Sequence, residues 1–281
     1  KDDSPIHGAL IFLHGRYQDG LMMKEEVPKI FHHLPVQSIF PTAPIPRGHA
    51  KPSWFNHSSP PRRVPRWRRF LKRAWRKLRG KAKNQAELNR TLNSFPDEIM
   101  ADSIQRVHQL IDSTIKSGIP SEHIVVGGFS QGGCVAWRAA LTYPRRLGGS
   151  VLLSTFAGNS TSVRIEPVNQ RLNVFVGHGQ DDDRIPIEQG RNLASVLKKK
   201  GVNVDFKAYR SLNHAIPTKG SPAAVDIANF FETRLRDALL KAAIDTVYEA
   251  MLDRLDGMVN SEDELLNVDV SARLHASTPS V

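Results

Sequence analysis

Residues 123–137 read HIVVGGFSQGGCVAW and hold the pattern Gly-x-Ser-x-Gly, with Ser130 at its centre. An apolar run precedes the serine and a helical pattern follows it, which predicts a sharp turn from a buried strand into a helix. Such a turn needs glycine on both sides of the serine, because a Cβ there would clash with neighbouring backbone. The stretch therefore predicts that Ser130 is a nucleophile raised above one edge of a sheet.

Other apolar runs of strand length recur along the chain, and segments with helical periodicity lie between most of them. Alternation of this kind predicts an α/β fold with a mostly parallel central sheet and helices on both faces. The expected strands lie at 9–15, 36–44, 123–130, 148–155, 172–179 and 202–209, and the expected helices at 97–117, 131–143, 187–199 and 222–236.

We expect one α/β domain over residues 1–237, with residues 60–95 as a basic insertion in it, and an acidic extension over 238–281. The extension begins with a helical pattern and holds three basic and eight acidic residues. The chain has 281 residues, enough for a large core, and its single cysteine, Cys134, excludes an internal disulfide. The single cysteine fits a reducing compartment, so we expect a cytoplasmic protein. No apolar run approaches the roughly 18 residues of a membrane-spanning helix.

A nucleophilic serine needs a base and an acid, which in α/β enzymes follow it in the order Ser, then Asp or Glu, then His. His214 lies in RSLNHAIP, a loop between a strand pattern and a helix pattern, and we predict that it is the base. His275 also follows in order but lies in the polar tail. The loop 180–186 offers three consecutive aspartates, and physical reasoning alone does not choose among them.

The charge that develops on a reacting carbonyl oxygen needs two N–H donors. We expect one from the main chain of Gln131, directly after the serine. The loop after the first strand, LHGRYQDG, should provide the other from the main chain of Arg16. The charge of the Arg16 side chain is not used in this role.

Six segments occur in the order typical of one family. They are IFLHG, PTAP, PSWF, GGFSQGG, GHGQDDDRIP and NHAIP. Over residues 6–236, apart from the basic insertion, the chain resembles the acyl-protein thioesterase and phospholipase/carboxylesterase family of α/β-hydrolases. The resemblance implies a serine hydrolase that cleaves fatty acyl thioesters on proteins, or esters of lysophospholipids and small acids, without a metal or cofactor.

The resemblance also implies roles for particular residues. The family's pattern His-Gly-x-x-Asp-x-x-Val-Pro identifies Asp182 as the catalytic acid, with Ile185 in place of the valine. It implies that His178 is a turn residue. The PSWF segment lies over the mouth of the site in this family, so Trp54 and Phe55 are candidate substrate contacts.

One family motif is altered in this chain. The family has His-Gly-x-Gly-Asp after the first strand, whereas this chain has Tyr17 at the second glycine and Asp19 one residue late. We therefore expect an altered oxyanion loop. Tyr17 is a further candidate contact for substrate.

Residues 60–83 hold twelve Lys or Arg and no acidic residue. Without them the chain has 27 basic and 28 acidic residues, so the formal net charge of +11 belongs to this segment alone. A generally basic protein of the chromatin type is thereby excluded.

Apolar residues recur at helical spacing in this segment, which predicts a cationic amphipathic helix. We expect residues 62–83 to contact an anionic membrane at its surface. Packing on the domain, a calmodulin-like partner and the acidic tail are alternatives, and nucleic acid is disfavoured because no RNA-binding fold accompanies the helix. The candidate contacts are Trp67, Arg68, Arg69, Phe70, Leu71, Lys72, Arg73 and Trp75.

The sequence thus predicts a serine hydrolase whose substrate is an acylated protein or a lipid ester. Two alternatives remain open. One is a carboxylesterase that acts on small soluble esters. The other is a non-catalytic hydrolase fold that displays the basic helix to a membrane or a protein. The oligomeric state is left open.

Overall fold

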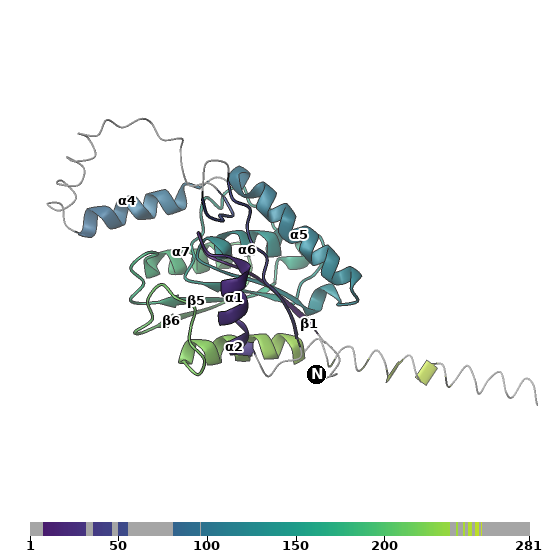
Figure 1. Ribbon diagram of the computed structural model, residues 1–281. Coiled ribbons are helices and arrows are strands. Elements are labelled where there is room, and N and C mark those ends of the chain that lie inside the picture. The colour runs from purple at the N-terminus through teal and green to yellow at the C-terminus, as the bar shows by residue number, and fades with distance from the viewer. Residues whose placement is uncertain are drawn as a thin grey trace, which may run out of the picture. The chain divides into compact units, whose positions relative to one another are not determined.

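A single six-stranded sheet organises the protein (Figure 1). The computed structural model describes residues 8–31, 36–46, 50–55, 81–95 and 97–236, together with single helical positions between 240 and 254. The strands are β1 (Gly8–Leu13), β2 (Val36–Ile39), β3 (Ile124–Phe129), β4 (Gly149–Leu153), β5 (Asn173–Gly179) and β6 (Asn203–Tyr209). They lie in the order β2-β1-β3-β4-β5-β6, and every pair is parallel. The predicted parallel sheet is confirmed.

Helices connect these strands, as a parallel sheet requires. The helices are α1 (Gly20–Glu26), α2 (Pro28–Phe31), α4 (Lys81–Asn93), α5 (Ala101–Lys116), α6 (Gln131–Thr142) and α7 (Ile187–Lys199), and residues 222–236 are also helical. Short 3-10 turns lie at Asp97–Met100, Ser121–His123 and Pro167–Asn169. The predicted helices 131–143, 187–199 and 222–236 match closely, and 97–117 is a 3-10 turn followed by α5.

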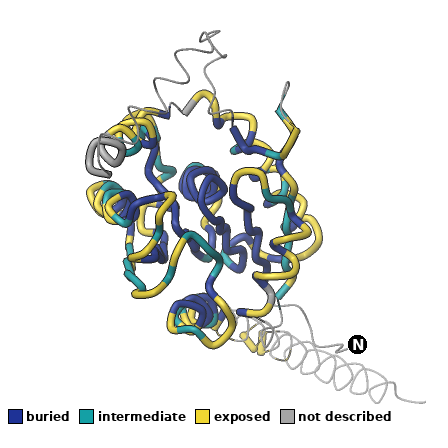
Figure 2. The backbone as a smooth tube through the Cα atoms, turned by 60° about the vertical axis from the view of Figure 1, so that its left-hand side comes forward, coloured by how far each residue is buried: buried dark blue, intermediate teal, exposed yellow. Residues whose placement is uncertain are grey.

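Side chains alternate between the two faces of each strand, and each face packs under its own helices. On β1, Ile11 and Leu13 join the core beneath α5, α6 and α7, whereas Leu10 and Phe12 join the core beneath α1 and the helix 222–236. Buried residues are concentrated in the sheet and in α6 (Figure 2), and α6 is buried along nearly its whole length. The prediction of helices on both faces is therefore correct.

The helix α4 differs from the prediction, which gave no separate helix between the basic segment and residue 97. Leu92 is buried in the core, and two amide pairs join α4 to α7, Asn89 with Gln189 at 2.9 Å and Asn93 with Asn192 at 3.4 Å. The segment is polar, so tertiary contacts rather than a broad apolar stripe hold this helix. The amphipathic helix predicted before it lies outside the described residues.

The chain divides into two compact units, Lys1–Leu235 and Arg236–Val281. The first contains the whole sheet. In the second, the described positions, Leu240, Ile244, Val247 and Met251 among them, are helical, as their spacing predicts.

The core under the helix 222–236 provides a test of the fold. Phe231 is fully buried there, so we expect Phe231→Ala to lower the free energy of unfolding by about 3–5 kcal/mol in a denaturant titration. Val225 lies on the same helix and is 48% exposed, and Val225→Ala should change that energy by about 0.5 kcal/mol or less. Equal effects of the two substitutions would contradict the assigned face.

Candidate active site

Ser130 lies on a strained turn between β3 and α6. Its φ of 54° is in the left-handed region, which a residue with a side chain adopts only at a cost. A Cβ on Gly128 would lie 2.5 Å from the carbonyl carbon of Gly132, and a Cβ on Gly132 would lie 2.5 Å from the carbonyl oxygen of His14. The predicted need for glycine on both sides of the serine is therefore explained by close backbone contacts.

The structure brings Ser130, His214 and Asp182 together in one chain of hydrogen bonds. The Ser130 hydroxyl donates to His214 Nε2 across 3.0 Å, and His214 Nδ1–H donates to Asp182 Oδ2 across 2.8 Å. The three residues follow β3, β6 and β5, whose carboxyl ends lie at the same edge of the sheet. His214 also packs against the Phe129 ring at 4.7 Å between centroids, which fixes the plane of the imidazole.

Asp182 is distinguished from its two neighbours by burial. Its side chain is fully buried, whereas Asp181 and Asp183 are exposed. The Arg184 and Ile185 amides donate to Asp182 Oδ1 at 3.0 and 2.8 Å. Burial by itself would raise the pKa of Asp182, but hydrogen bonds from His178, His214 and the Ile185 amide outweigh it and hold that pKa below its usual value. Asp182 is therefore held as a carboxylate.

The loop after β1 lies directly against the turn that carries the serine. A Cβ on Gly15 would lie 3.0 Å from the Phe129 ring. The amides on either side of Arg16 are occupied, since Gly15 N–H donates to Gln18 Oε1 at 2.8 Å and Tyr17 N–H donates to Pro52 O at 3.0 Å. No hydrogen bond joins the Arg16 amide to another described residue. Its position between two amides with partners is consistent with the predicted role as a donor to substrate.

The altered motif in this loop has a structural explanation. Tyr17, at the position of the missing glycine, keeps the left-handed backbone that glycine would favour, with a φ of 69°. The Arg16 guanidinium lies 4.7 Å from the centre of its ring. Asp19 accepts the Met22 amide and caps α1, so the shifted aspartate begins that helix. The Gln18 side chain, which accepts the Gly15 amide, stabilises the loop instead of the shifted aspartate.

The predicted substrate contacts differ in exposure. Trp54 and Phe55 are only 4% and 3% exposed, and their rings pack against His14 and Phe95. Tyr17 is 46% exposed. Of the three, only Tyr17 presents a large surface to solvent. Trp54 and Phe55 are buried beside Gln131, which follows Ser130, and we call these two residues the wall of the site.

Two polar side chains that hold this wall were missed by sequence reasoning. Gln131 accepts the Trp54 amide at 3.0 Å and donates to Phe55 O at 2.8 Å. His14 Nδ1–H donates to Gly15 O at 2.6 Å, and the Ala43 amide donates to His14 Nε2 at 2.9 Å. Burial lowers the pKa of His14, so it remains neutral and fixes the loop. Their only sequence signal was membership in the motifs GGFSQGG and IFLHG.

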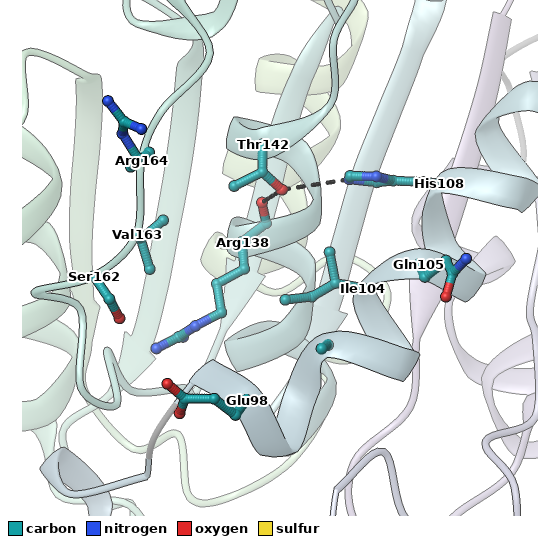
Figure 3. Close-up of a pocket in the computed structure, with 10 residues that line it drawn as sticks. Glu98, Ile104, Gln105, His108, Arg138, Thr142, Ser162, Val163 and Arg164 are labelled. Atoms are coloured by element: carbon teal, nitrogen blue, oxygen red, sulfur yellow. Dashed lines mark hydrogen bonds between the residues drawn. The ribbon is translucent and has the colours of Figure 1, made fainter.

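A hollow of about 550 Å³ lies beside α5 and α6 (Figure 3). Ile104, Val163 and the stem of Arg138 contribute apolar surface to it. His108 and Thr142 lie on one side, with His108 Nε2–H donating to Ala139 O at 3.0 Å and lying 3.4 Å from Thr142 Oγ1. The hollow contains none of the predicted catalytic residues.

The candidate membrane contacts, Trp67 to Trp75, lie outside the described residues. In the part of the chain that the structure describes, no helix is long and apolar enough to span a bilayer.

The fold and the site have the form of an α/β-hydrolase with a serine nucleophile, and comparisons with known proteins agree. A family model described as phospholipase/carboxylesterase matches residues 86–232. A probable carboxylesterase of Oryza sativa subsp. japonica is 35% identical over 122 residues, which cover 43% of this chain and 46% of the rice protein. The matched part is thus less than half of that relative.

Two longer matches extend the comparison. Acyl-protein thioesterase 1 of Mycosarcoma maydis is 30% identical over 241 residues, 80% of this chain and 90% of the relative. The crystal structure of Arabidopsis thaliana SOBER1 superimposes with a TM-score of 0.61 at 24% identity, covering 81% of this chain and 99% of that one. The chain belongs to the phospholipase/carboxylesterase family.

The left-handed backbone of Tyr17, in the loop after β1, can be tested by a matched pair of substitutions. Tyr17→Ala and Tyr17→Gly both remove the ring, but only glycine adopts a φ of 69° without strain. We expect Tyr17→Gly to be more stable than Tyr17→Ala by about 1 kcal/mol in chemical unfolding. An alanine variant as stable as the glycine variant would show that the backbone here is not left-handed.

Proposed function

We propose that this protein is a serine hydrolase that cleaves acyl thioesters or esters through Ser130, His214 and Asp182. The hydrogen-bond chain from Ser130 Oγ to Asp182 Oδ2, with lengths of 3.0 and 2.8 Å, carries the proposal. The substrate class follows from the relatives named as carboxylesterases and as an acyl-protein thioesterase. Fatty acyl groups on protein cysteines and on lysophospholipids are the substrates we favour, and small soluble esters are the alternative.

In the first half of the reaction, His214 Nε2 takes the Ser130 proton as Oγ bonds to the carbonyl carbon. The negative charge moves to the carbonyl oxygen. When the tetrahedral intermediate collapses, the bond to the leaving sulfur or oxygen breaks and His214 returns the proton to the leaving group. Asp182 stabilises the imidazolium that forms between these steps and keeps Nδ1 protonated.

In the second half, water replaces the serine as nucleophile. His214 takes a proton from water, the hydroxide bonds to the acyl carbon, and Ser130 leaves with the proton from His214. The products are a free acid and the original enzyme. In both halves the Arg16 and Gln131 amides are the proposed donors to the carbonyl oxygen, in keeping with the contact between the Gly15 loop and Phe129.

Active-site labelling separates this function from that of a non-catalytic hydrolase fold. We expect a fluorophosphonate to modify the wild-type protein but not Ser130→Ala, because the probe bonds only to an activated serine. Ser121→Ala replaces another buried serine, which lies in the turn Ser121–His123 at the start of β3, whereas Ser130 follows the end of that strand. This variant should be labelled like the wild type. If wild type and Ser130→Ala stay equally unlabelled at neutral pH, the enzyme proposal is wrong.

We also propose that the basic segment holds the enzyme at an anionic membrane on the cytoplasmic side. Twelve cationic residues lie within 60–83, and each one near an anionic leaflet adds up to about 1 kcal/mol. The segment follows PSWF, which lies in the wall of the site, so membrane contact would bring acyl substrates to the serine.

Deleting residues 62–80 removes most of that charge while leaving α4 intact. We expect the deletion to abolish co-sedimentation with phosphatidylserine vesicles and to leave the hydrolysis of a short soluble ester unchanged. A variant that lacks residues 238–281 should bind the vesicles like the full chain. Equal vesicle binding by the 62–80 deletion and the full chain would contradict the membrane proposal.

A further inference from the structure

His178 is a buried histidine that the mechanism above does not use. The family resemblance implied a turn residue, but His178 lies inside β5 and is fully buried. Its Nε2 faces two acceptors, Ile185 O at 2.8 Å and Asp182 Oδ2 at 3.5 Å. Since both partners are oxygens that accept, Nε2 carries the hydrogen. The imidazole therefore joins the two ends of the turn that holds Asp182.

The opposite side of the ring is closed by α7. His178 Nδ1 is buried and has no hydrogen-bond partner among the described residues. A Cβ on Gly190 would lie 2.5 Å from it. Glycine is less favourable than alanine inside a helix, so its presence in α7 is explained by the close approach of this ring. The contact with Gly190 therefore prevents the His178 ring from moving away from Asp182.

Asp182 Oδ2 consequently faces two histidines, His214 at 2.8 Å and His178 at 3.5 Å. The groups around His178 come from three elements. Asp182 and Ile185 lie in the loop after β5, and Gly190 lies in α7. His214, in the loop after β6, contacts the same Asp182 oxygen. In the described chain His178 makes no other ion pair. The neighbouring Asp181, Asp183 and Arg184 are exposed.

We propose that His178 is a positioning residue for the hydrolase reaction, which holds Asp182 in line with His214 and shares the charge of Oδ2. The inference rests on the proposed function, because it concerns how well Asp182 supports His214. A carboxylate oxygen with two donors is a weaker acceptor than one with a single donor. His178 therefore limits how strongly Asp182 Oδ2 accepts the hydrogen bond from His214 Nδ1–H.

The proposal makes a kinetic prediction that a purely structural role would not. In His178→Leu, Asp182 Oδ2 keeps only the His214 donor and becomes a stronger acceptor. The acid limb of the kcat/KM profile should therefore move to higher pH. We also expect kcat/KM at its pH plateau to fall about 10-fold, through kcat rather than KM, because Asp182 is less firmly held.

Two further variants keep the test independent of whether His178→Leu folds well. In His178→Gln the side-chain amide can place an N–H near the position of Nε2, so this variant should restore both the acid limb and most of the rate. Gly190→Ala keeps the His178 imidazole but displaces it, because the new Cβ would lie 2.5 Å from Nδ1. This variant should shift the acid limb in the same direction as His178→Leu.

His108→Leu is a matched control, because His108 Nε2 also lies 3.0 Å from a main-chain oxygen, that of Ala139. His108 lines the hollow beside α5 and α6, which contains none of the predicted catalytic residues. We expect it to lower thermal stability without moving the acid limb. Identical pH profiles for His178→Leu, His108→Leu and wild type would overturn the proposal.

The resting full-length protein gives a second readout that does not need turnover. The proton between His214 Nδ1 and Asp182 should have a strongly downfield NMR signal, and that signal should move in His178→Leu but not in His108→Leu. A wild type without hydrolysis or fluorophosphonate labelling would contradict the proposed function, while the NMR comparison would still decide the positioning role. An unmoved signal in His178→Leu would overturn that role even in an active enzyme.

Discussion

The structure of the candidate site depends on one imidazole, that of His214, which is hydrogen-bonded to both Ser130 and Asp182. His214 joins an alcohol oxygen at 3.0 Å to a carboxylate oxygen at 2.8 Å, and the three residues come from loops up to 84 positions apart in the chain. Neither bond forms unless β3, β5 and β6 end at the same edge of the sheet. The hydrogen-bond chain is thus a consequence of parallel strand order, and errors in that order would separate the three groups.

The same edge explains the position of the loop after β1, from which we propose an oxyanion donor. The strand order reverses between β1 and β3, and open parallel sheets bind ligands at such a reversal. The loops after β1 and β3 therefore meet, and Gly132 approaches His14 too closely for any side chain. Around this contact the protein uses neutral, fully bonded polar groups such as His14 and Gln131, which keep the wall rigid without placing another charge near Asp182.

Local patterns in the sequence predicted most of the sheet and the order of the site residues, because apolar runs and the Ser-Asp-His order are properties of the linear chain. The choice of Asp182 among three aspartates came from family resemblance, and its physical basis is burial, which depends on its contacts with His178 and His214. The roles of Gln131 and His178 depend on partners distant in sequence or on a neighbouring helix, so no local pattern revealed them.

The left-handed Tyr17 was missed for another reason, since a tyrosine in the sequence does not indicate a positive φ. The helix α4 was missed because its polar sequence is held by contacts with α7.

The central claim is that Ser130 and His214 act as a single unit, and double substitution tests it most directly. If the hydroxyl and the imidazole serve one proton transfer, the loss of kcat/KM in Ser130→Ala should nearly equal that in Ser130→Ala combined with His214→Ala, since either change already removes the unit. Turnover of one acyl thioester by the wild type, both single variants and the double variant measures this. Losses that add in the double variant would show two independent contributions and contradict the account.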